Sequence, residues 1–120
     1  MTQKAKLKNG GVSRKTANAI LGTVTTGLTA TGNASQTGGL YVTDDINVIT
    51  TAGATTNSIT LPNYLGAGES ITVCNYTTGQ TLNIYPPVGG KIRGGATNAA
   101  ITLASPGTAT LICIDNLNFI

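Results

Sequence analysis

Few side chains in this chain of 120 residues could take part in chemistry. It contains no His and only four acidic residues, Asp44, Asp45, Glu69 and Asp115. A general acid–base enzyme needs a group that titrates near its working pH, and that group is most often His. A Ser or Cys nucleophile needs an adjacent base, for which only a carboxylate or a lysine is available here. We therefore expect a protein that is not an enzyme and that uses no cofactor.

The acidic residues and the two cysteines do not match a metal-binding motif. The four acids could collect a hard cation such as calcium, but no Asp-x-Asp-x-Asp-Gly run is present, and an Asp-Asp pair before a strand is typical of a solvated turn. A zinc site would need His or more than two Cys. No apolar stretch follows the basic start of the chain, so we expect no secretory signal. Cys74 and Cys113 are then predicted to be small buried residues in a reducing compartment.

The basic residues are concentrated at the start of the chain. Five of the seven lie in the first 15 positions: Lys4, Lys6, Lys8, Arg14 and Lys15. The rest of the chain has two basic and four acidic residues, so the net charge of +3 comes from this arm. The arm is either a solubilising terminus or a segment that docks on an acidic surface. It has no aromatic residue to stack on bases, so we favour a protein partner over nucleic acid.

The composition predicts an all-β protein. The chain has 22 Thr, 16 Gly and 11 Asn, while only 9% of its residues are charged. Thr suits the half-exposed face of a strand, and Gly and Asn suit the turns between strands. No run of about 18 apolar residues occurs, so we expect no membrane span. A chain with so few charges risks association through its strand edges, which favours edges and faces covered by partners.

The apolar pattern predicts short strands from residue 40 onward. Residues 12–37 have poor periodicity and are predicted to be extended, as an edge strand or a strap between subunits. The clearest feature is a hairpin in which residues 69–76 and 81–85 flank the loop Thr77-Thr78-Gly79-Gln80. Leu82 and Ile84 should face inward and Asn83 outward. The other predicted strands are 46–50, 58–61, 99–103 and 108–114, with a short strand or loop at 89–95 and a packed end at 116–120.

The number and spacing of these strands predict a β-sandwich or jelly-roll-like domain. We expect a basic N-terminal arm and extended strap over residues 1–37 and a β-sandwich body over residues 38–120. The core is lean in large residues, with one Phe and no Trp. Such a core favours oligomerisation as a further source of buried surface.

The segment from Ile59 to Ile114 resembles a module of structural proteins of tailed bacteriophages. It contains Ile-Thr-Leu-Pro (59–62), Glu-Ser-Ile-Thr-Val-x-Asn (69–75), Thr-Leu-Asn-Ile-Tyr-Pro (81–86), Gly-Gly-Lys-Ile (89–92) and Asn-Ala-Ala-Ile-Thr-Leu (98–103). The module occurs in small capsid decoration (cement) proteins and in head- or tail-fibre proteins. These are residues of strands and turns, so the resemblance transfers no functional residue.

The resemblance implies a virion protein, made in the host cytoplasm, that binds the major capsid protein at the capsid surface. Cement proteins typically form trimers that bridge neighbouring capsid subunits. The alternative is the tip of a fibre or spike that binds a host receptor or glycan. Such a tip needs exposed aromatic side chains, and besides Phe119 the chain offers only Tyr41, Tyr64, Tyr76 and Tyr85.

Overall fold

A computed structural model describes residues 23–32, 34–53 and 57–120. These residues form strands and loops without a helix, so the all-β prediction is confirmed. The strands are β1 (Val24–Thr29), β2 (Leu40–Tyr41), β3 (Ile46–Thr51), β4 (Ser58–Thr60), β5 (Ser70–Asn75), β6 (Leu82–Tyr85), β7 (Lys91–Ile92), β8 (Ile101–Leu103), β9 (Gly107–Ile112) and β10 (Asn118–Phe119).

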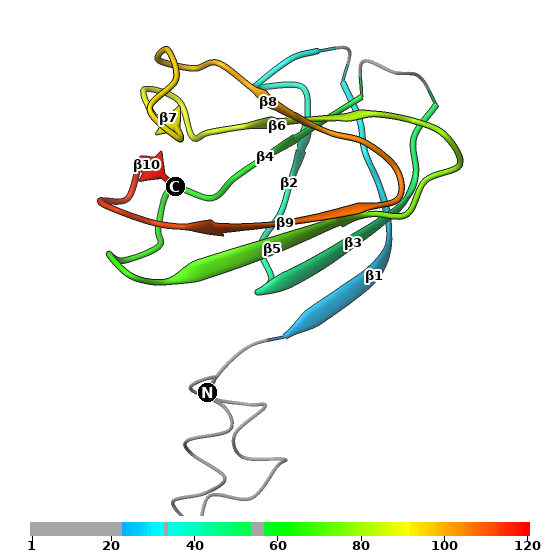
Figure 1. The fold of residues 1–120 in the computed structure, drawn as a ribbon, viewed down its shortest axis with the longest axis horizontal. Coiled ribbons are helices and arrows are strands. Elements are labelled where there is room, and N and C mark those ends of the chain that lie inside the picture. Colours follow the sequence, from blue (N-terminus) through cyan, green and yellow to red (C-terminus); the bar gives the residue numbers. More distant parts are fainter. Residues whose placement is uncertain (1–22, 33, 54–56) are drawn as a thin grey trace, which may run out of the picture.

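The strands form a β-solenoid (Figure 1). Strands β1, β3 and β5 are parallel in one sheet, sheet A, which the antiparallel strand β9 completes. Strands β2, β4 and β6 are parallel in the second sheet, sheet B, which the antiparallel strand β8 completes. From β1 to β6 the chain therefore passes from one sheet to the other at each connection and adds one parallel strand to each sheet per coil.

This arrangement corrects two predictions. The body is a solenoid rather than a jelly-roll-like sandwich, because neighbouring strands β1 to β6 within each sheet are parallel and come from successive coils. The predicted hairpin of residues 69–76 and 81–85 is also wrong, since β5 lies in sheet A and β6 in sheet B. Both strands exist as predicted, but the loop between them connects the two sheets.

The core fills the space between the two sheets. Ile71 and Val73 of β5 are buried, as are Leu82 and Ile84 of β6, while Asn83 points outward as predicted. In β3 the inward positions are Asn47 and Ile49. Ile46 and Val48 share the other face of the strand, which is the outer one.

Two buried asparagines stabilise connections between the sheets. The Asn75 amide donates to the main-chain oxygens of Gln80 and Leu103, each at 2.8 Å. Its side-chain oxygen accepts hydrogen bonds from the amide and hydroxyl of Thr77, at 3.1 and 2.7 Å. Asn47 donates to the main-chain oxygen of Asp44 at 2.7 Å. Every polar atom of the Asn75 side chain is thus paired, as a buried amide requires.

One end of the core is closed by a third, two-stranded sheet of β7 and β10. Phe119 and Ile92 are both buried there, so the predicted packing of residues 116–120 is confirmed for Phe119, whereas Asn116 and Ile120 are exposed. The chain passes so close at this point that a Cβ on Gly90 would overlap the main-chain oxygen of Leu117. The Ile120 side chain itself is exposed, and its backbone pairs with that of Ile112 in β9.

The described part of the predicted strap contains an edge strand over residues 24–29, and residues 34–37 lie in a bend and a turn. Strand β1 lies at the edge of sheet A and pairs with β3, with Val24 aligned to Ile46. Leu28 packs against the core. Residues 24–29 are therefore joined to the same sheet as the body from residue 38 onward.

Candidate tyrosine groove and uncharged sheet face

A surface hollow lies where the parallel strands of sheet B end. The segments that follow β2, β4 and β6 meet there, because the carboxyl ends of parallel strands lie at one edge of a sheet. The hollow measures about 190 Å³. We call it the tyrosine groove, and its lining residues are Tyr41, Val42, Thr43, Leu61, Pro62, Asn63, Tyr64, Pro87 and Val88.

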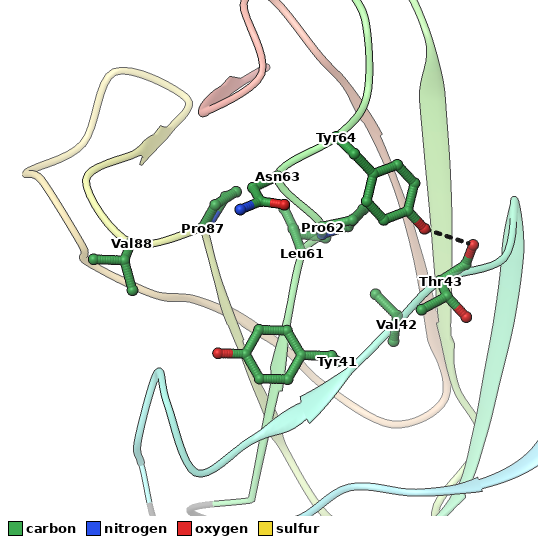
Figure 2. Close-up of a pocket in the computed structure, with 9 residues that line it drawn as sticks. All are labelled: Tyr41, Val42, Thr43, Leu61, Pro62, Asn63, Tyr64, Pro87 and Val88. Carbon is green, nitrogen blue, oxygen red and sulfur yellow. Dashed lines mark hydrogen bonds between the residues drawn. The ribbon is translucent and has the colours of Figure 1, made fainter.

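Two exposed tyrosine rings stand on different sides of the groove (Figure 2). Tyr41 is 53% exposed and Tyr64 is 61% exposed. The Tyr64 hydroxyl donates to the main-chain oxygen of Thr43 at 3.1 Å, which fixes this ring over the connection after β2. Pro62 and Pro87 are buried in the lining of the groove. Their pyrrolidine rings restrict the backbone there.

Three polar side chains of the groove have no hydrogen-bond partner among the described residues. They are the Tyr41 hydroxyl, the Thr43 hydroxyl and the Asn63 amide. Figure 2 shows the Asn63 amide in the middle of the lining, between Pro87 and Tyr64. The groove therefore combines apolar walls with donors and acceptors that only solvent or a ligand can satisfy.

The charged residues of the described part of the chain lie at one end of the solenoid, which we call the charged end. Asp44 and Asp45 precede β3, Glu69 precedes β5, and Asp115 follows the antiparallel β9, so all four acids lie at the same end of sheet A. Lys91 and Arg93 lie in and beside β7, which pairs with β10 next to the end of β9. With four acids and two basic residues, this region carries a charge of −2.

The outer face of sheet A carries no charge. None of the strands β1, β3, β5 and β9 contains a charged residue. We call this surface the uncharged face, and its outward side chains include Val24, Ile46, Val48, Thr72, Thr108, Thr110 and Ile112. Thr72 and Thr110 share a hydrogen bond of 2.9 Å across it. Val24, Ile46 and Ile112 are exposed apolar residues, and surfaces of this kind commonly mark an interaction site.

The structure separates the residues predicted as candidates. Lys4, Lys6, Lys8, Arg14 and Lys15 lie outside the described residues. Tyr41 and Tyr64 share the groove, whereas Tyr76 follows β5 at the opposite end of the solenoid and Tyr85 is half-buried in β6. The prolines that follow β4 and β6 are visible in the sequence and could have indicated the groove. Only the solenoid topology shows that Pro62 and Pro87 line the same hollow.

Within the described residues, the candidate metal ligands and cysteines form no metal site. No group of three His, Cys, Asp or Glu side chains lies close enough to hold an ion in that part of the chain. Cys74 and Cys113 are free and buried, as predicted.

The Asp115 carboxylate accepts several hydrogen bonds within the turn between β9 and β10. The Asn118 amide donates to both carboxylate oxygens, at 2.8 and 3.0 Å, and the Asn118 main-chain N–H donates at 3.1 Å. The side-chain hydrogen bond from Asn118 is the main reason that the pKa of Asp115 lies below its ordinary value. The turn between β9 and β10 is therefore held by an ionised carboxylate.

Comparison of the chain with family models, curated proteins and solved structures gives no match. The described residues contain no helix that could span a membrane. The class of protein is therefore defined by the fold, an all-β solenoid with an uncharged sheet face and a tyrosine groove.

Proposed function

We propose that this protein is a virion structural protein, a capsid decoration (cement) protein that binds the outer capsid surface as a trimer and bridges capsid subunits. The observation that carries the proposal is the segregation of charge. All the described charges lie at or beside the charged end, and sheet A presents an uncharged face. The resemblance of residues 59–114 to bacteriophage structural proteins supplies the type of assembly.

The uncharged face is proposed to contact further copies of the same chain. A charged partner would gain no ion pair on this surface, whereas two identical uncharged faces bring no like charges together. Contact would also remove exposed apolar side chains such as Ile46 and Ile112 from water. Strand β1 is an edge strand without charged residues, and such edges are normally covered.

The basic arm is proposed to contact the major capsid protein. It carries five basic residues, opposite in sign to the −2 of the rest of the chain. Thr23, the first described residue, donates its hydroxyl hydrogen to the Asp44 carboxylate at 2.6 Å, so the described chain begins at the charged end.

The first test is the native mass of the purified full chain by light scattering. A stable species near three times 12.1 kDa is expected. Ile46→Lys should shift this species to monomer, because it places three like charges on adjoining copies of the uncharged face. Thr102→Lys is the matched control, since Thr102 is an exposed residue on the outer side of sheet B. A monomer at all concentrations, or equal dissociation by both variants, would contradict the proposed interface.

A second test addresses the arm. Deletion of residues 1–15 should leave the oligomer intact and weaken rebinding to capsids from which the protein has been removed. Unchanged capsid binding after this deletion would exclude the arm as the capsid-binding segment.

A further inference from the structure

We propose that the tyrosine groove is a binding site for a neutral saccharide. This inference goes beyond the structural role, because the groove is formed within one chain and at the charged end rather than on the uncharged face. It rests on the walls of the groove, its polar groups, its charge and its size.

The walls offer aromatic surface that is already positioned. Tyr41 and Tyr64 are both more than half exposed, so their rings can receive the apolar C–H face of a sugar ring. The Tyr64 ring is held by its hydrogen bond to Thr43, and Pro62 and Pro87 fix the backbone between the rings. A ligand would therefore find the site largely formed, which reduces the entropy lost on binding.

The polar groups match the hydroxyls of a sugar. The Tyr41 and Thr43 hydroxyls can each donate and accept, and the Asn63 amide offers both donors and an acceptor. None of these groups has a partner among the described residues. Sugar hydroxyls also donate and accept, so they can pair with such groups, whereas an apolar ligand would bury them without partners.

The charge around the groove favours a neutral sugar over an acidic one. No lining residue is charged, and Asp44 and Asp45 follow Thr43 directly in the chain. A carboxylated or sulfated sugar would meet these acids without an opposing cation in the lining. A neutral hexose or N-acetylhexosamine avoids this repulsion.

The size of the groove favours a single ring. Its volume of about 190 Å³ lies below the ~300–1,000 Å³ typical of sites for drug-sized ligands. A proline-rich peptide in an extended conformation also binds tyrosine and proline surfaces, but it needs a longer groove for several residues at ~3.1 Å each. The saccharide is therefore the better fit.

The test is an NMR titration of the ¹⁵N-labelled full chain. The probes are lactose, cellobiose and N,N′-diacetylchitobiose, with sialyllactose as an acidic sugar and a proline decamer as a peptide. At least one neutral probe should shift the signals of Asn63, Tyr64 and Val88. Tyr41→Ala and Tyr64→Ala should each weaken its binding about tenfold, as expected when one stacked ring is lost. Tyr64→Phe keeps the ring but loses the hydrogen bond to Thr43 that orients it, so this variant should weaken binding, though less than Tyr64→Ala does.

Tyr76→Ala is the matched control, since Tyr76 is a similarly exposed tyrosine at 57% but lies at the opposite end of the solenoid. This variant should bind the neutral probe as wild type does. No shift with any neutral probe would overturn the proposal, as would stronger binding of the proline decamer or of sialyllactose. Equal loss of binding in Tyr76→Ala would also overturn it. The tyrosines are exposed, so all variants should fold, which a ¹⁵N spectrum without ligand verifies.

Discussion

The Tyr64 hydroxyl donates a hydrogen bond of 3.1 Å to the main-chain oxygen of Thr43, although the two residues are 21 positions apart. Tyr64 follows β4 in sheet B, and Thr43 follows β2 in the same sheet. The bond therefore links the ends of two successive coils. It keeps one wall of the tyrosine groove in place and gives the exposed ring a defined orientation.

The first prediction concerns this hydrogen bond. Tyr64→Phe removes the donor while keeping the ring, so it should lower the free energy of unfolding by only about 0.5–1 kcal/mol, because the pair is exposed and water can replace the lost partner. Denaturant unfolding measures this change. A loss several times larger would show that the bond supports the fold and not only the groove.

The second prediction concerns the buried Asn75. Asn75→Ala removes an amide that donates to Gln80 and Leu103 and accepts from Thr77, which leaves buried backbone groups unpaired. We expect the free energy of unfolding to fall by about 2–4 kcal/mol. Asn83→Ala is the control, since Asn83 is a half-buried, outward asparagine in β6 and its loss should cost less than about 1 kcal/mol. Equal effects of the two substitutions in denaturant unfolding would contradict the assigned role of Asn75.

The third prediction concerns the close approach of Gly90 to Leu117. Gly90→Ala places a methyl group against the main-chain oxygen of Leu117, and backbone cannot rotate away as a side chain can. The two-stranded cap of β7 and β10 should be displaced, with a loss of about 3 kcal/mol or more in the free energy of unfolding. At Gly53 the nearest atom to an added Cβ is 4.0 Å away, so Gly53→Ala should have little effect. A wild-type melting temperature for Gly90→Ala would refute this packing.

The fourth prediction concerns the pH dependence of the turn between β9 and β10. Hydrogen bonds, chiefly from the Asn118 side chain, lower the pKa of Asp115 in the folded protein. Because the folded-state pKa is below the unfolded one, this stabilisation is complete above the unfolded-state pKa and is lost as the pH falls through the folded-state pKa. An NMR titration of the Asp115 carboxyl carbon should give a midpoint below the ordinary value of 3.8.

Asn118→Ala should raise that midpoint toward the ordinary pKa, since it removes the main donor to the carboxylate. Asn63→Ala, an asparagine substitution in the tyrosine groove, should leave it unchanged. An unaltered midpoint in Asn118→Ala would mean that other groups lower the pKa of Asp115.

The positions of the strands were predictable because they depend on local chemistry. Alternation placed Leu82 and Ile84 inward and Asn83 outward, and Pro62 and Pro86 marked strand ends. In β3 the apolar pattern does not show which face is buried, because the inward residue Asn47 is polar and its amide donates to the main-chain oxygens of Asp44 and Thr72. The hairpin prediction failed because a short Thr-Gly loop can connect strands of two different sheets as well as two paired strands of one sheet.

The solenoid itself left no regular period in the sequence. Val24 aligns with Ile46 and Ile46 with Thr72, so one coil spans 22 residues and the next spans 26. Loops of different length are accommodated at the connections, where no ladder enforces a constant spacing. The pairing partners of each strand were therefore decided only in three dimensions.

The sequence by itself determined the all-β class, most of the strand positions, the buried cysteines and the separation of a basic arm from a body of few charges. These properties follow from residue type and alternation within a few positions. Only the tertiary structure decided that Tyr41 and Tyr64 line the same groove and that the acids gather at one end, leaving a sheet face without charge. Those relationships depend on which strands are neighbours, and parallel pairing between coils brings together residues about 20 positions apart that share no local pattern.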